Sequence, residues 1–403
     1  MPSDEGPSFS IPRSGLLVAG LVVTLVLLGL GTYWLTSSPQ TTRLQTGLSV
    51  AEAMSSDTTG YRRATAPRPF SFPADHGPHP GYKTEWWYLT GNLDGPEGGA
   101  FGYELTIFRF AVAPPAPSTP ASQSDSLLSN WRTNQTYMAH FAVSDGRRER
   151  FHAEERFARG GAGLAGARAE PFRVWLEDWS MSSTGSDTFP VRLQAYTDEA
   201  RIDLTVRPEK PLVLQGNQGL SQKGPGAGNA SYYYSFTRLA TEGTLVIDGD
   251  SLPVSGTSWM DREWSTSALG PNQEGWDWFA LQLDDGRDVM YYQLRNNDGT
   301  TSRFSKGTLV QPDGTAQRLS QGEVSLDVLD TWTTPDGTHT YPIEWQLEIP
   351  SENIDLHVVP LFRNQELDVF VRYWEGAVRV GGSATGRGYV ELTGYGESDT
   401  PAS

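Results

Sequence analysis

The sequence contains no cysteine among its 403 residues and only six histidines. Disulfide bonds, thiolate nucleophiles, cysteine-ligated zinc and a cysteine-linked lipid anchor are therefore excluded. Common catalytic signatures are missing too: there is no Gly-x-Ser-x-Gly, no His-Glu-x-x-His and no phosphate-binding loop. The glycine-rich residues 224–228 lack the flanking strand and helix that a dinucleotide site requires. These patterns predict neither a cofactor nor a metal.

Positive charge is also scarce. The chain has 31 lysines and arginines against 48 aspartates and glutamates, which gives a formal net charge of −17. No run of basic residues offsets this balance. We therefore expect no nucleic-acid partner and no docking on an anionic membrane surface.

Sustained helical periodicity is absent after residue 70, whereas glycine (43) and proline (27) are frequent. The chain instead alternates apolar and polar residues in short runs, such as 85–93, 100–110 and 289–295, with turns of the Asp-Gly type between many of them. Such runs are typical of β-hairpins. We predict an all-β body. Because eight strands with their turns need roughly 130–180 residues, the body is long enough for two barrels.

Only one long hydrophobic run occurs. Residues 14–35 carry no charge, and about 20 apolar residues are enough to cross a bilayer as a helix. A cleaved signal peptide is the alternative, but its apolar region should be only about 7–15 residues long, with a cleavage site directly after it. We predict a cytoplasmic tail (1–13), an uncleaved transmembrane signal anchor in the inner membrane (14–35) and a linker (36–68). The body then lies outside the cytoplasm, in the periplasm.

Two aromatic segments of the body resemble each other. Residues 86–94 match residues 276–284, and in both copies the following strand ends in an arginine, Arg109 or Arg295. Counted by twos, each segment has one aromatic and polar face and one apolar face. The match favours two similar β units, although one this short can also arise by chance.

Tryptophans and carboxylates are densest in GTSWMDREW at residues 256–264, followed by GWDWF at residues 275–279. A core strand would use Val, Ile and Leu, because buried indole N–H groups and carboxylates need partners. On a strand, Asp261 and Glu263 share a face and Arg262 points the other way. A carboxyl that faces an apolar cavity has its neutral form favoured and can donate a proton. An acid pair tied to Arg262 and to backbone amides explains the pattern equally well.

Three further candidates lie outside this stretch. Residues 75–79, DHGPH, place two histidines near an acid, but a rigid turn explains them better than a metal site, since no third ligand lies nearby. Glu85, which opens the first aromatic strand, is either a cavity acid or a salt-bridge partner of Arg109 or Arg262. Glu375 is a candidate cavity acid in a segment that reads more simply as a closing aromatic strand.

Several motifs together resemble the carotenoid 1,2-hydratase-like superfamily, and most closely its AttH-like bacterial branch. They are HGPH (76–79), EWWYLTG (85–91), GTSWMDREW (256–264), YWEGAV (373–378) and GYVELTG (388–394). The resemblance covers roughly residues 70–395. It implies two tandem lipocalin-like antiparallel β-barrels, which we place at 69–250 and 251–397. The family includes hydratases of isoprenoid or flavonoid-type alkenes, and Asp261 is the residue most similar to their proton-donating aspartate.

Three functions are consistent with these observations. The main interpretation is a membrane-anchored extracytoplasmic protein that binds a hydrophobic small molecule or lipid near the junction of the barrels. The alternative is a hydratase (hydro-lyase) in which Asp261 protonates a double bond, with Glu263 and Glu85 as further catalytic candidates. The third, implied by the family, is an accessory protein that docks on the permease of an ABC transporter. The candidate ligand-binding residues are Trp86, Tyr88, Trp259, Trp264, Trp276, Trp278, Tyr292, Arg295, Trp374 and Glu375.

Overall fold

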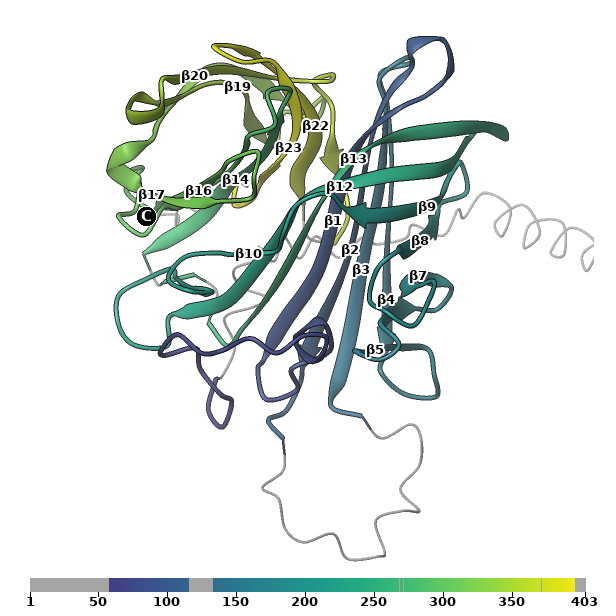
Figure 1. Ribbon diagram of the computed structural model, residues 1–403, viewed down its shortest axis with the longest axis vertical. Helices are drawn as coiled ribbons and strands as arrows, with labels where there is room; N and C mark the ends of the chain where they lie inside the picture. The colour runs from purple at the N-terminus through teal and green to yellow at the C-terminus, as the bar shows by residue number, and fades with distance from the viewer. Residues whose placement is uncertain (1–57, 116–132, 268, 271, 371, 396–403) are drawn as a thin grey trace, which may run out of the picture. The chain divides into compact units, whose positions relative to one another are not determined.

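The computed structural model describes residues 58–115, 133–267, 269–270, 272–370 and 372–395, which form two antiparallel β-sheets without an α-helix. The all-β prediction and the division into two barrel-like sheets are confirmed. In Figure 1 the second sheet, green to yellow, curls into a nearly closed ring, whereas the first is a more open half-barrel. The predicted transmembrane segment lies outside the described residues. Among the residues that are described, no helix is long and apolar enough to cross a membrane.

The first sheet has 13 strands, and its order is β4-β3-β2-β1-β13-β12-β9-β8-β7-β6-β5, with β10 and β11 paired to β12. Its strands are β1 (Thr84–Asp94), β2 (Ala100–Ala111), β3 (Gln135–Asp145), β4 (Arg150–Arg159), β5 (Ala165–Arg168), β6 (Arg173–Leu176), β7 (Trp179–Ser183), β8 (Val191–Tyr196), β9 (Ala200–Pro208), β10 (Val213–Leu214), β11 (Leu220–Gln222), β12 (Ala230–Ile247) and β13 (Asp250–Ser265). The long strands β12 and β13 lie at its centre beside β1, so the aromatic and acidic stretch lies in the middle of the sheet.

The second sheet has ten strands in the order β17-β16-β15-β14-β23-β22-β20-β19-β18, with β21 paired to β22. They are β14 (Gln273–Leu283), β15 (Asp288–Asn296), β16 (Lys306–Val310), β17 (Ala316–Ser320), β18 (Ser325–Thr333), β19 (Thr340–Ile349), β20 (Ile354–Pro360), β21 (Glu366–Leu367), β22 (Tyr373–Gly382) and β23 (Gly386–Leu392). Short 3-10 turns occur at η1 (Ala74–His76), η2 (Pro96–Gly98), η4 (Gln321–Glu323) and η5 (Pro350–Glu352).

The change from one sheet to the other comes after β13. This strand pairs with both β1 and β12, and the next strand, β14, pairs only within the second sheet. The crossing therefore lies between Ser265 and Gln273, later in the chain than the predicted domain boundary at 250/251. Residues 256–264, which the predicted boundary assigns to the second barrel, therefore belong to a central strand of the first sheet.

Each sheet has a core face and an outer face, as the alternation of apolar and mixed residues requires. Trp87 and Leu89 lie in the core of the first sheet, and Phe279 and Leu281 lie in the core of the second. The intervening residues of the same strands lie in a third cluster, where the outer faces of the two sheets meet. The faces approach closely: a Cβ at Gly102 would lie 2.6 Å from the Cβ of Ala377.

Candidate active site

A cavity of about 260 Å³ lies between the two outer faces. Both sheets supply its walls, which combine aromatic, apolar and acidic side chains. The aromatic ones include Trp86, Tyr88, Tyr233, Trp276, Trp278 and Tyr292; the apolar ones include Phe108, Phe110, Met138, Phe157, Leu294 and Phe370; the acids are Asp261, Glu263, Glu375 and Glu391. A mostly apolar pocket with a few convergent polar groups is the usual form of a small-molecule site.

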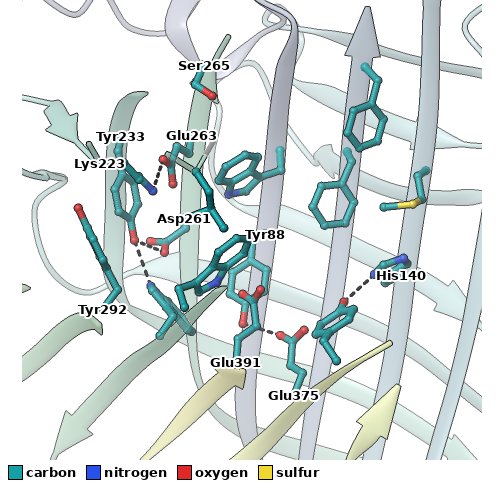
Figure 2. A pocket seen from close by; sticks show the side chains of 18 of the residues that line it. Tyr88, His140, Lys223, Tyr233, Asp261, Glu263, Ser265, Tyr292, Glu375 and Glu391 are labelled. Atoms are coloured by element: carbon teal, nitrogen blue, oxygen red, sulfur yellow. Dashed lines mark hydrogen bonds and ion pairs between the residues drawn. The ribbon is translucent and has the colours of Figure 1, made fainter. Parts of the chain in front are cut away.

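Asp261 lies on the wall that the first sheet provides (Figure 2). Its position in β13 pairs with Tyr88 of β1 on one side and with Ser235 of β12 on the other. Oδ1 accepts hydrogen bonds from Ser235 Oγ (2.5 Å) and Trp259 Nε1 (2.7 Å), and Oδ2 accepts one from the Tyr233 hydroxyl. Burial raises the pKa of Asp261 to about 7, although the three hydrogen bonds act in the opposite direction. The carboxyl can therefore both give and take a proton near neutral pH.

Glu263 lies on the same face as Asp261 but has a different environment. Lys223 Nζ lies 2.6 Å from Glu263 Oε1, and this ammonium also lies 5.0 Å from the centre of the Tyr292 ring. The carboxylate and the ammonium form a largely buried ion pair, with 5% and 16% of their side chains exposed. The two acids therefore differ: Asp261 can hold a proton near neutral pH, whereas Glu263 is paired with the Lys223 ammonium.

The wall formed by the second sheet carries Glu375 and Glu391, which are direct cross-strand partners on β22 and β23. Glu375 is fully buried and accepts a hydrogen bond from the Tyr88 hydroxyl (2.5 Å). Glu104, on β2, is also fully buried, and neither of its carboxyl oxygens makes a hydrogen bond of normal geometry. Burial, followed by repulsion from Glu104 and Glu391, raises the pKa of Glu375 well above its usual value.

Glu104 makes stability depend on pH. Burial raises its pKa from 4.5 to about 8, so between these values the folded protein keeps a proton that the unfolded chain has lost. Its contribution to stability is complete below about pH 4.5 and is lost as the pH rises toward 8. We expect Glu104→Gln to flatten the fall in unfolding free energy between pH 5 and 8, by up to about 1.4 kcal/mol per pH unit. Denaturant titrations across this range measure the slope, with the exposed Glu97→Gln as control. Equal slopes in Glu104→Gln and wild type would contradict the assignment.

The cavity brings together eight of the sequence-predicted site residues. They are Asp261, Glu263, Trp86, Tyr88, Trp276, Trp278, Tyr292 and Glu375. Trp259 does not line the cavity but lies on the same face of β13 as Asp261, in the same cluster as Tyr88 and Trp278, and it donates a hydrogen bond to Asp261.

The other predicted residues lie elsewhere because their positions alternate onto the core faces. Trp264 is buried in the first core and Trp374 in the second. Arg295 pairs with Asp277 and lies over the ring of Tyr395 at 3.7 Å. None of the three lines the cavity.

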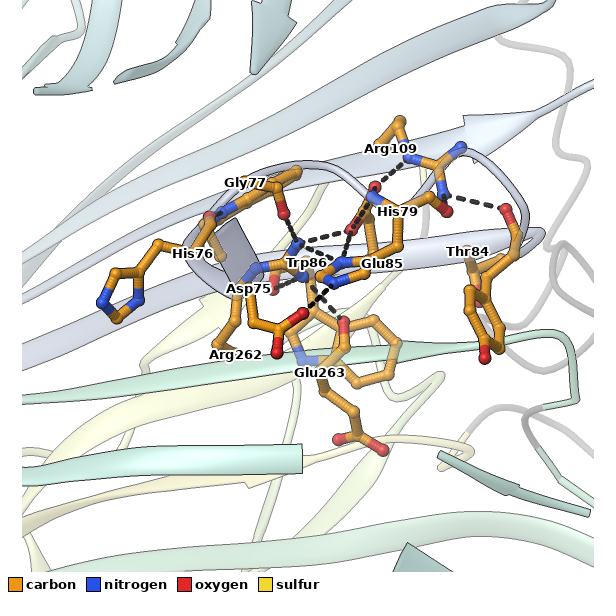
Figure 3. A network of polar contacts seen from close by, with 12 residues as sticks. Asp75, His76, Gly77, His79, Thr84, Glu85, Trp86, Arg109, Arg262 and Glu263 are labelled. Carbon is orange, nitrogen blue, oxygen red and sulfur yellow. Dashed lines mark hydrogen bonds and ion pairs between the residues drawn. The ribbon is translucent and has the colours of Figure 1, made fainter. Parts of the chain in front are cut away.

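Glu85 is the centre of a buried ion network behind the cavity wall (Figure 3). It pairs with Arg109 and with Arg262 Nη2 (2.5 Å), and it accepts bonds from the backbone N–H of His79 at 2.9 and 3.1 Å. The His79 ring stacks on Trp264 at 3.8 Å. Glu85 therefore matches the salt-bridge interpretation, and both arginines named in it take part.

The two early histidines have partners other than a metal. His76 Nδ1 lies 2.6 Å from the Tyr234 hydroxyl, and His79 lies between Asp75 and Glu85. In the part of the chain that the structure describes, no three His, Asp or Glu side chains form a group that could hold a metal ion.

Sequence reasoning missed Tyr233, Lys223, His140, Tyr373 and Glu391 as cavity residues. Strand alternation was the available signal for most of them. Tyr233 lies two positions before Ser235, and Glu391 lies opposite Trp278 on the neighbouring strand. Lys223 follows the short strand β11, so no strand periodicity could have placed it.

The fold and the cavity define a β-protein of two barrel-like sheets with an acid-bearing, aromatic-lined site between them. The chain belongs to the AttH-like family, whose model matches residues 63–395. The chain is 33% identical to a protein from Nitrosomonas europaea described as AttH, with a TM-score of 0.72 over 83% of this chain and 99% of that one. The predicted family is thereby confirmed.

Three further relatives are named as hydratases or a dehydratase. Kievitone hydratase from Nectria haematococca has the same fold, with a TM-score of 0.61 at 17% identity over 83% of this chain and 96% of that one. In sequence, the chain is 22% identical over 172 residues to kievitone hydratase from Fusarium solani subsp. phaseoli (42% of this chain, 47% of the relative). It is 24% identical over 187 residues to the dehydratase asqC from Emericella nidulans (43% and 50%). The chain thus spans about half the length of the curated relatives it matches.

Proposed function

We propose that this protein is a hydro-lyase, which adds water to a carbon–carbon double bond of a largely apolar substrate or removes it. The observation that carries the proposal is Asp261: a buried carboxyl with a pKa raised to about 7, facing an aromatic-lined cavity. A general acid or base works best when its pKa lies near the working pH. The hydratase and dehydratase among the relatives favour this function over ligand binding without chemistry.

In the hydration direction, the O–H bond of neutral Asp261 breaks and its proton forms a C–H bond at one alkene carbon. Positive charge then develops at the other carbon, where the faces of Trp86, Trp278 and Tyr88 are available to stabilise it. Water forms the C–O bond there and releases one proton to a base. Dehydration is the reverse, with the Asp261 carboxylate removing the proton from carbon.

The experiment is an incubation of the full-length protein in H₂¹⁸O with a panel of isoprenoid and flavonoid-type alkenes that includes kievitone. We expect one panel member to gain a molecule of water that carries ¹⁸O, detected by mass spectrometry. A protein that quenches its tryptophan fluorescence with these compounds but never incorporates ¹⁸O binds them without catalysis. That outcome would overturn the hydro-lyase proposal.

We retain the finer expectations as proposals. They are lipocalin-like barrels, a single-pass anchor at residues 14–35, a periplasmic body and contact with the permease of an ABC transporter. The uncharged run and the family resemblance support them. Protease accessibility of the body in spheroplasts tests the location, because a cytoplasmic body would stay protected.

A further inference from the structure

Glu375 is a second acid of the cavity, and the opposite sheet supplies it. Tyr88 connects it to Asp261, because Tyr88 pairs with Asp261 across the strands and donates its hydroxyl hydrogen to Glu375 Oε1 (2.5 Å) (Figure 2). The other oxygen, Oε2, has no hydrogen bond of normal geometry, although the residue is fully buried. A buried carboxylate oxygen without a donor is costly, whereas a protonated one can itself donate.

A chain of polar side chains runs from Glu375 toward the edge of the cavity. The Tyr373 hydroxyl lies close to the Glu375 carboxyl and interacts with it. The same hydroxyl lies 2.6 Å from His140 Nδ1, and His140 Nε2 lies 2.9 Å from Glu155 Oε2. Glu155 has 11% of its side chain exposed, whereas His140 has 1%. The chain therefore leads from a fully buried acid to a group that solvent reaches.

One assignment of protons satisfies every contact in this chain. Neutral Glu375 donates its proton to the Tyr373 hydroxyl, Tyr373 donates to His140 Nδ1, and His140 donates from Nε2 to the Glu155 carboxylate. Moving only the first two of these protons, from Glu375 to Tyr373 and from Tyr373 to His140 Nδ1, leaves Glu375 ionised and His140 as an imidazolium next to Glu155. Such a cation next to a carboxylate is stabilised by their attraction.

We propose that Glu375 is the second acid–base group of the cavity and that Tyr373, His140 and Glu155 exchange its proton with solvent. The proposal rests on the hydro-lyase function for its catalytic part. In dehydration, neutral Glu375 gives its proton to the leaving hydroxyl as the C–O bond breaks. The Asp261 carboxylate takes the proton from the neighbouring carbon, the double bond forms, and water leaves. Hydration runs the same steps backwards, with ionised Glu375 taking a proton from the attacking water.

The alternative is that Glu375 serves only as an acceptor that fixes Tyr88 between the two sheets. A neutral carboxyl is compatible with both roles, but only the proton pathway requires that its proton exchange through Tyr373. The exchange can be measured without any substrate, by transferring the full-length protein into D₂O and following the C=O stretch of protonated carboxyl groups by infrared spectroscopy.

We expect Glu375→Gln to remove one such band, which in wild type shifts rapidly in D₂O. Tyr373→Phe, which keeps the ring, should retain the band and slow its shift at least tenfold, and His140→Gln should do the same. Tyr341→Phe is the matched control, because Tyr341 also donates to a glutamate, Glu366 Oε1 at 2.9 Å, but lies in the second core. A set of protonated-carboxyl bands that Glu375→Gln leaves unchanged would overturn the proposal. Equal exchange rates in Tyr373→Phe and wild type would do so too, since they would show exchange through water in the cavity.

The proton pathway and the hydro-lyase function can be tested independently of each other. A protein that exchanges as expected but hydrates no alkene contradicts the enzymatic function and leaves the proton pathway intact. If wild type and Glu375→Gln turn over the substrate at equal rates, Glu375 has no catalytic role, and the catalytic part of the proposal is contradicted. With a substrate in hand, we expect Glu375→Gln to lower kcat roughly 100-fold or more, with little change in ligand affinity.

Discussion

Asp261→Asn is expected to lower kcat by a factor of about 10² to 10⁴, the usual contribution of a positioned general acid or base. The amide keeps the shape of the side chain and can still accept hydrogen bonds from Ser235 and Trp259, but it cannot transfer a proton. The loss should therefore appear in kcat, while the fluorescence change on ligand binding persists. Steady-state kinetics of the ¹⁸O reaction, together with the circular dichroism of both proteins, measure the two effects separately.

The pH dependence gives an independent check on this role. Because the pKa of Asp261 is about 7 and that of Glu375 is raised well above its usual value, hydration, which needs neutral Asp261 together with ionised Glu375, should speed up toward pH 7 and level off above it. Dehydration, which needs the carboxylate, should speed up as the pH rises toward 7. Ser235→Ala removes one hydrogen bond to the charged form, so it should move both profiles to higher pH. Unchanged profiles in Ser235→Ala, or near-normal turnover in Asp261→Asn, would assign the proton to another group.

Glu85→Gln is expected to have the largest effect on stability, a loss of about 3–5 kcal/mol in unfolding free energy. The substitution removes the negative charge shared by Arg109 and Arg262, whose side chains are 1% and 0% exposed. Two guanidinium groups would then be buried without full compensation. The neighbouring arginines hold the pKa of Glu85 well below its usual range, so this stabilisation is present above about pH 4.5 and is lost as the pH falls further.

The matched control is Glu242→Gln, which removes a carboxylate from an exposed ion pair with Arg207. Its effect should stay within about 0.5 kcal/mol, since exposed pairs contribute little. Urea denaturation at pH 7 compares both variants with wild type. A loss below about 1 kcal/mol for Glu85→Gln would mean that the network relaxes or admits water.

The sequence alone predicts how side chains alternate along each strand. This alternation is enough to place Trp86 and Tyr88 on one face of β1 and Trp87 on the other. It could not show which face of a strand meets the other sheet. Trp264 therefore joined the candidate ligand residues, although it is the cross-strand partner of Glu85 and alternates with Glu263, so it lies on the core face. Glu375 and Asp261 are far apart in the sequence, and only the packing of β22 against β1 brings them to one cavity. The relay through Tyr373 and His140 depends on the same packing and has no sequence signal of its own.

The cavity lies between two sheets whose opposite faces are filled cores. In a barrel with a central ligand, each substitution that reshapes the pocket also alters the interior that holds the barrel together. Here, alternate residues along the cavity-facing parts of β1, β13, β14 and β22 line the cavity, while their neighbours, such as Trp87, Trp264 and Trp374, lie in a core. Residues of the cavity wall lie outside both hydrophobic cores. Substituting them, in evolution or by engineering, can therefore change the range of substrates. The residues that contact a substrate are thus largely different from the residues that form the two hydrophobic cores.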